Sequence, residues 1–222
     1  MQIFPESTDL CRASRLHTRP STIVEAAKVL PPREVANFLV ETFFEYAQTN
    51  YFYVDEQSLR QKFDSFYSHP QPLSPEDAAW LCTLLMLFAT GTQFAHLTSQ
   101  ARQDDASRTS DLDLAVASSP DDEAALNFYY AAITLIPDVI SLASIDSVQA
   151  FLLLGMYTLP IDAAGLSFTY LGIAIKMAVQ NGMHRRYHKG MDARTIEIRN
   201  RIWWTTYTLE KCVFRPARLY QC

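Results

Sequence analysis

The chain contains 222 residues, of which 49% are hydrophobic and 19% charged, a length and composition typical of one globular domain rather than a disordered segment. Its 24 acidic residues outnumber its 19 basic residues and give a formal net charge of −5, which disfavours nucleic-acid binding through phosphate neutralisation. Only 6 glycines are present, and the scarcity of two-residue turn signals argues against an all-β protein.

The first predicted elements are a lead-in and two helices. Residues 1–31 are predicted to be a flexible lead-in, because Glu6 and Asp9 interrupt the amino terminus and no apolar run of signal-peptide length follows. Apolar residues then recur at spacings of three and four over residues 33–49, which predicts an amphipathic helix. Asp55 is placed to cap a second helix that ends near residue 67.

The middle of the chain combines an apolar helix with a polar segment. Ser74 and Asp77 resemble a helix-capping pair, and residues 80–95 follow with apolar side chains around the whole helix axis, which predicts a central buried helix. Ser, Asp, Gln and Arg then dominate residues 98–123, a composition that buries little area. We therefore predict a mobile polar loop between two halves of the domain.

The second half is predicted to contain four helices, over residues 124–140, 148–159, 163–181 and 193–212. Pro160 and Asp162 divide the apolar stretch 148–175 into pieces shorter than the ~20 residues that span a bilayer, so we expect two buried helices and no membrane partner. Gly182 is placed to end the third helix in the left-handed conformation. Together the elements predict an all-α fold, a multi-helix bundle of about six or seven helices in two halves.

Catalytic and metal-binding patterns are incomplete. The acidic runs at 104–105 and 121–123 lack the later acid of an Asp-Asp-x-x-Asp diphosphate motif, and no nucleophile elbow or phosphate-binding loop occurs. The cysteines lie outside zinc-ligand spacing and are expected to be reduced thiols: Cys11, Cys82, Cys212 and Cys222. We predict no catalytic site, metal or cofactor in this chain. An all-helical enzyme with an apolar pocket for an isoprenoid-like substrate remains an alternative, which would require paired carboxylates on helix walls.

Four segments stand out in the second half: IDSVQAFLLLGMY at residues 145–157, YLGIAIKMA at 170–178, NGMHR at 181–185 and EIRNRIWWTTY at 197–207. Taken together and in order, they resemble the regulatory, or middle homology, domain of the fungal zinc-cluster transcription factors. The similarity extends more weakly through residues 39–55 and covers roughly residues 32–216. The final segment, EIRNRIWWTTY at residues 197–207, resembles the family's hallmark. The residues that carry the resemblance are Gln149, Tyr157, Gly172, Gly182, His184, Arg185, Arg199, Arg201, Trp203, Trp204 and Tyr207.

The resemblance implies that residues 32–222 are a regulatory domain of a nuclear transcription factor that controls DNA-templated transcription. In that family a six-cysteine cluster with two zinc ions recognises DNA, and this chain contains no such cluster. The expected partners are other protein chains, through self-association, the transcription machinery or co-regulators, with a small effector as a further candidate. A truncated relative that pairs with full-length factors is a second alternative.

Trp203 and Trp204 are expected to have a structural role. Adjacent helical residues point about 100° apart, so the two rings would dock one helix against two neighbours, with Arg199 able to stack on Trp203. His184 and Arg185 begin a basic run that complements the negative end of the preceding helix. Because the family continues with a Gly-Arg-Pro turn and further helices, we expect the C-terminal part of the domain to be missing.

Overall fold

The computed structural model describes residues 20–69, 72–104, 120–186 and 190–214, and within these ranges it contains nine α-helices and no strand. The predicted all-α class is confirmed, while the helix number exceeds the expected six or seven. The additional helices arise where a short helix lies inside the predicted lead-in and where one predicted helix is broken in two.

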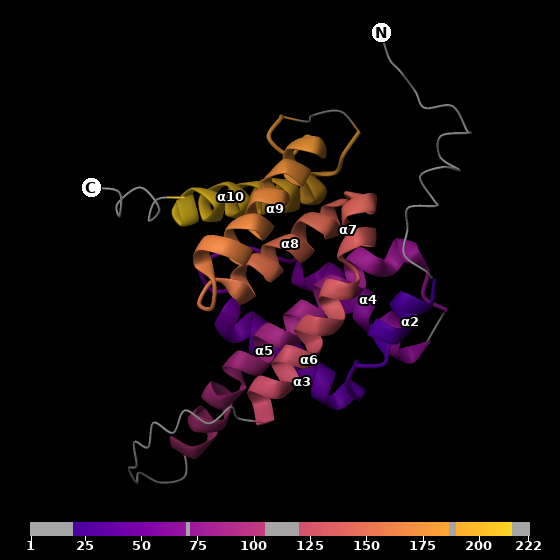
Figure 1. Ribbon diagram of the computed structural model, residues 1–222, viewed down its shortest axis with the longest axis vertical. Coiled ribbons are helices and arrows are strands. Elements are labelled where there is room, and N and C mark those ends of the chain that lie inside the picture. Colours follow the sequence, from indigo (N-terminus) through magenta and orange to yellow (C-terminus); the bar gives the residue numbers. More distant parts are fainter. Residues whose placement is uncertain (1–19, 70–71, 105–119, 187–189, 215–222) are drawn as a thin grey trace.

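Helix α5 (Ala78–Asp104) forms the centre of the fold (Figure 1). It packs against α3 (Arg33–Thr42), α6 (Pro120–Thr134), α7 (Ile136–Leu142) and α8 (Ile145–Thr158). Its first half is buried on every side because it is apolar around the whole axis, as predicted. Nine of its residues are 0% exposed: Ala78, Leu81, Cys82, Leu84, Leu85, Met86, Leu87, Phe88 and Ala89.

Helices α3 and α5 approach each other very closely at a glycine. A Cβ atom placed on Gly91 would lie 2.6 Å from the backbone oxygen of Leu39. Real side chains do not tolerate such a separation, and the obstructing atom belongs to the main chain of α3. The absence of a side chain at position 91 therefore sets the distance between these two core helices.

The predicted lead-in is wrong over residues 20–27, which form helix α2 (Pro20–Ala27). This helix packs against α6. Ile23 and Ala26 are 1% and 4% exposed and belong to the hydrophobic core. Among the described side chains of this short helix, these two alone are fully buried. Two such positions are too few to give a clear helical periodicity in the sequence. The rest of the predicted lead-in up to residue 19 lies outside the described ranges.

The helix predicted over residues 124–140 is divided into α6 and α7, which meet at an angle of 50°. Pro137 lies in the first turn of α7, where its missing N–H breaks no hydrogen bond. In the interior of one continuous helix the same proline would remove a bond and clash with the preceding turn. Helix α7 ends at Ala143, a residue with a φ of 45° in the left-handed region.

The polar loop predicted over residues 98–123 is wrong at both ends. Helix α5 continues to Asp104 and α6 begins at Pro120, so both ends of the 98–123 segment are helical. Residues 105–119 lie outside the described ranges. The two halves nevertheless share one core, because α5 and α6 pack directly against each other.

Above α5 in the view of Figure 1 lie α8, α9 (Phe168–Gln180) and α10 (Ala193–Phe214). A π-helical turn, η4 (Ala163–Ser167), leads into α9. Gly182 ends α9 with a φ of 67°, and the backbone N–H of Met183 donates to the Ala178 oxygen over 3.0 Å. The left-handed termination predicted for Gly182 is confirmed. The buried face of α9 comprises Tyr170, Leu171, Ala174, Met177 and Ala178, while Phe168 at its start is 40% exposed.

Two helical segments of the described ranges are long and apolar enough to cross a membrane by length and composition: Pro75–Ala95 and Ala163–Gln180. A third candidate exists if the bent pair α6 and α7 is counted as one span. The first segment is 83% buried inside the fold and the second 33%. The apolar character of Pro75–Ala95 is thus accounted for by its place in the core.

Candidate functional site

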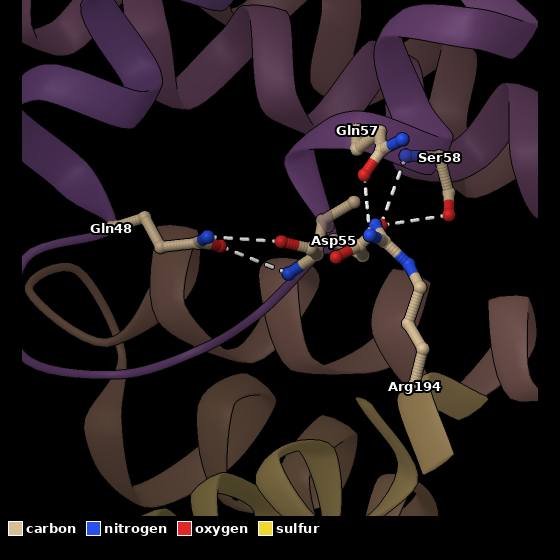
Figure 2. Close-up of polar contacts among 6 residues, drawn as sticks. Gln48, Asp55, Gln57, Ser58 and Arg194 are labelled. Atoms are coloured by element: carbon tan, nitrogen blue, oxygen red, sulfur yellow. Dashed lines mark hydrogen bonds and ion pairs between the residues drawn. The ribbon is translucent and has the colours of Figure 1, made fainter. Parts of the chain in front are cut away.

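The two halves of the chain meet where the loop after η2 (Phe43–Ala47) lies against α10 (Figure 2). The side chain of Gln48 organises this loop. Its Nε2 donates to the Val54 oxygen over 2.9 Å, and its Oε1 accepts from the backbone N–H groups of Tyr53 at 3.0 Å and Val54 at 2.9 Å. One amide thus satisfies three backbone groups of a loop that has no secondary structure to pair them.

Asp55 links this loop to α4 (Glu56–Ser68) and to α10. It caps α4 as predicted, because its carboxylate accepts from the Ser58 backbone N–H at 2.9 Å and from the Ser58 hydroxyl at 2.7 Å. Arg194 of α10 donates to the same carboxylate at 2.6 Å and also to Gln57 (Figure 2). Burial opposes ionisation of Asp55, but the Ser58 and Arg194 contacts outweigh it and lower the pKa of the carboxyl below its ordinary value.

Asp55→Ala is expected to lower the free energy of unfolding by about 1–2 kcal/mol, because the N-cap of α4 is lost together with an ion pair. A lowered pKa stabilises the fold above the unfolded-state pKa, and that contribution disappears as the pH falls through the folded-state value. Urea unfolding at neutral and acidic pH measures both effects. Asp64→Ala, which removes an exposed carboxylate paired with Arg33 at 2.8 Å, should change stability by less than about 0.5 kcal/mol. Equal costs for the two variants would contradict the capping role.

Helix α10 holds the same loop at two further points. The Phe52 backbone N–H donates to the Thr205 hydroxyl over 3.1 Å. The guanidinium of Arg201 lies 5.2 Å from the centre of the Phe52 ring, while its Nε donates to Glu197 at 2.9 Å. Through these contacts α10 connects the second half of the chain to the first.

A cavity of about 170 Å³ lies beside Asp55, between α4, α5, α8 and α10. We call it the interhelical pocket. Its walls are mainly apolar, but polar groups of three helices also reach it. The lining residues are Val54, Asp55, Ser58, Leu59, Lys62, Trp80, Thr83, Ile145, Asp146, Gln149 and Ile198.

Two lining side chains have unsatisfied polar groups. Gln149 is 7% exposed, and its side-chain amide makes no hydrogen bond with any part of the chain that the structure describes. The indole Nε1 of Trp80 is likewise buried, with no partner among those residues. Buried polar groups normally have a partner, so the interhelical pocket is the strongest candidate for a ligand site.

On its other side, α10 is fixed by a chain of hydrogen bonds that starts at Arg199. This residue is 9% exposed, and its Nη2 donates to the Asn181 backbone oxygen at 2.6 Å. The Asn181 side chain in turn donates to the oxygens of Ala143 at 2.6 Å and Met177 at 2.9 Å. The contacts join α10, the end of α9 and the left-handed residue that follows α7.

The remaining residues of the family resemblance are divided between core and surface. Tyr157 is 3% exposed and stacks on Tyr129 with ring centres 5.3 Å apart. A Cβ atom on Gly172 would meet nothing within 4 Å, so space does not require glycine there.

The centre of the Trp203 ring lies 5.9 Å from that of His184 and 6.0 Å from that of Tyr207. Arg185 is exposed and donates from Nε to the His184 ring at 3.2 Å. Trp204 is 62% exposed, so the two tryptophans have different environments, and Tyr207 is 42% exposed.

The described residues do not fit a zinc site, since they contain no group of three or more His, Cys, Asp or Glu side chains that could hold a metal ion. Cys82 is buried in the core, and burial raises the pKa of its thiol to about 12. Cys212 is exposed, and both thiols are free. Cys11 and Cys222 lie outside the described ranges.

Sequence reasoning missed several residues of this region. Gln149 was identified only through the family resemblance, and nothing in the pattern pointed to Lys62, Asp146, Asn181 or Arg194. Their roles depend on contacts between segments far apart in the chain: Arg194 and Asp55 are 139 residues apart. The one signal available in the sequence was Gln149, a polar residue within an apolar helical segment.

Known proteins match this chain over nearly the same residues as the resemblance described above. Residues 40–214 match the family described as the fungal specific transcription factor domain. An uncharacterized transcriptional regulatory protein of Schizosaccharomyces pombe is 33% identical over 194 residues, which cover 87% of this chain and 23% of that protein.

Two further relatives are also named as regulators. The thiamine repressible genes regulatory protein thi1 of Schizosaccharomyces pombe is 27% identical, with 90% of this chain and 25% of that protein covered. The transcription regulator galc of Aspergillus niger is 27% identical, with 82% and 20% covered. The chain thus spans about a quarter or less of the length of these relatives. No solved structure matches it significantly.

Proposed function

The chain belongs to the fungal specific transcription factor domain family, and on this premise we propose that it is the regulatory module of a nuclear transcription factor. The observation that carries the proposal is the extent of the family match, which runs through both halves of one shared core and ends with α10. The curated relatives named above are regulators of transcription. Their function supports a regulatory role and offers no support for catalysis.

DNA contact in this proposal comes from a zinc cluster outside this chain. The net charge of −5 makes the module itself a poor phosphate ligand. Its own contribution is to bind other protein chains, such as a second copy, co-regulators or the transcription machinery. Helix α10 favours this role, because it presents the exposed rings of Trp204 and Tyr207 while its buried side is fixed to the core. Exposed aromatic rings are enriched in protein interfaces.

The test is to join residues 1–222 to an unrelated DNA-binding domain in a fungal cell and to measure a reporter gene downstream of its target site. We expect the reporter output to differ from that of the DNA-binding domain alone. Trp204→Ala should reduce the difference, whereas Asp64→Asn, an exposed substitution on α4, should not. Identical output with and without the chain, at equal protein levels, would contradict the regulatory function.

A further inference from the structure

The charges around the interhelical pocket are not evenly compensated. Asp55 is paired with Arg194 at 2.6 Å. Lys62 lies 3.9 Å from an Asp77 oxygen and 4.8 Å from the centre of the Trp80 ring. The carboxylate of Asp146, in contrast, accepts no hydrogen bond from any residue that the structure describes. It is the lining charge that most needs a partner.

Asp146 is also partly buried. Burial raises the pKa of its carboxyl, and the charge of Lys62 only partly offsets this effect. A partly buried carboxylate without a hydrogen-bond donor is stabilised when a cation or donor reaches it. The α8 wall of the pocket therefore favours positive charge or N–H groups, while Lys62 and the Trp80 indole N–H supply donors from α4 and α5.

Gln149 lies three residues after Asp146 on α8, so both side chains occupy the same face of that helix. Its amide oxygen is a second acceptor without a donor in the described part of the chain, and the residue is 7% exposed. Asp146 and Gln149 thus form a pair of acceptors beside one cavity. Hydrocarbon in the lining comes from Leu59, Ile145 and Ile198.

We propose that the interhelical pocket binds a small primary amine with a short apolar body. The ammonium group would donate to Asp146 and to the amide oxygen of Gln149, and the hydrocarbon would pack against the apolar walls. The size of the pocket sets the size of the ligand. A cavity of about 150 Å³ accepts benzene, so about 170 Å³ suits a molecule of roughly six to eight non-hydrogen atoms.

The pocket is shared by α4 of the first half and by α8 and α10 of the second. A bound amine would contact all three helices and favour the arrangement in which they are together. That such an amine acts as a transcriptional effector rests on the proposed function. That it binds rests only on the pocket.

The experiment titrates the full chain with isopentylamine, with the uncharged amide isovaleramide and with the anion isovalerate, and follows binding by calorimetry and by the shift in thermal unfolding. These probes have similar size and the same branched body, so the polar group is the main difference. We expect the amine to bind and the amide to bind at least about tenfold more weakly. Isovalerate should not bind, because its negative charge is repelled by that of Asp146.

Asp146→Asn keeps the shape of the side chain and should weaken amine binding by about tenfold or more. Gln149→Met keeps its length without the amide and should weaken binding severalfold. Asp64→Asn removes the same charge from an exposed position on α4 and should leave the affinity unchanged. If Asp146→Asn does not fold, the amine-to-acid comparison on the unmodified chain still decides the question.

Three outcomes would overturn the proposal: no amine binding up to about 10 mM, acid binding as tight as amine binding, or amine binding unaffected by Asp146→Asn. A chain that binds the amine but leaves the tethered reporter unchanged would retain the site and argue against the proposed function. The two failures are therefore distinguishable.

Discussion

Gly91→Ala is expected to lower the free energy of unfolding by about 3 kcal/mol, at the upper end of the usual cost of overpacking a core. The added methyl group would lie 2.6 Å from the Leu39 backbone oxygen, so α3 and α5 must separate to admit it. Ala is otherwise the better helix former by about 1 kcal/mol. Steric conflict predicts a lower free energy of unfolding, and helix propensity predicts a higher one. Chemical denaturation followed by circular dichroism distinguishes the two.

Gly172→Ala is the matched control, since it makes the same chemical change in α9 where nothing lies within 4 Å of the new Cβ atom. It should leave stability unchanged or raise it by up to about 1 kcal/mol. A Gly91→Ala protein as stable as the unmodified chain would show that the two core helices can move apart at little cost.

Arg199→Ala is expected to lower the free energy of unfolding by about 2–3 kcal/mol. The guanidinium is nearly buried and donates to the Asn181 oxygen at 2.6 Å, and hydrogen bonds from charged groups contribute about 1.5–3 kcal/mol. Its loss leaves the end of α9 without one of its partners. Calorimetry and urea unfolding measure the change.

Arg201→Ala is the control for Arg199→Ala on the same helix. Its ion pair with Glu197 is exposed, and its contact with Phe52 is a cation–π interaction at 5.2 Å, so the cost should be about 1 kcal/mol or less. If the two variants lose equal stability, the Arg199 contact does not anchor α10 in the way described.

Local signals in the sequence identified most helices. The apolar run of α5, the caps at Asp55 and Ser74 and the left-handed end at Gly182 were all visible, because each depends on residues within one or two turns. Pro137 was also visible, but the apolar periodicity continues across it and was read as one helix. Helix α2 contributes too few buried residues to produce a pattern.

The candidate site was far less predictable than the fold. Local spacing suggested that Arg199 is able to stack on Trp203 one turn away. It gave no sign that the guanidinium donates to Asn181, 18 residues earlier in the chain. Asp146 and Gln149 share a face of α8, but only the packing of α4, α5 and α10 makes that face the wall of a cavity. Tertiary contacts of this kind leave no periodic trace in a single sequence.

The apolar surface of α5 has a consequence for synthesis of the protein. Its segment Pro75–Ala95 is hydrophobic enough to resemble a membrane span, and its partners α6 and α8 lie later in the chain. At about 5–20 residues per second, a ribosome needs several seconds, up to about ten, to add the residues up to the end of α8. Until then α5 lacks at least one of these two partners on the nascent chain. The protein is therefore expected to depend on chaperones that shield apolar segments until α8 has emerged.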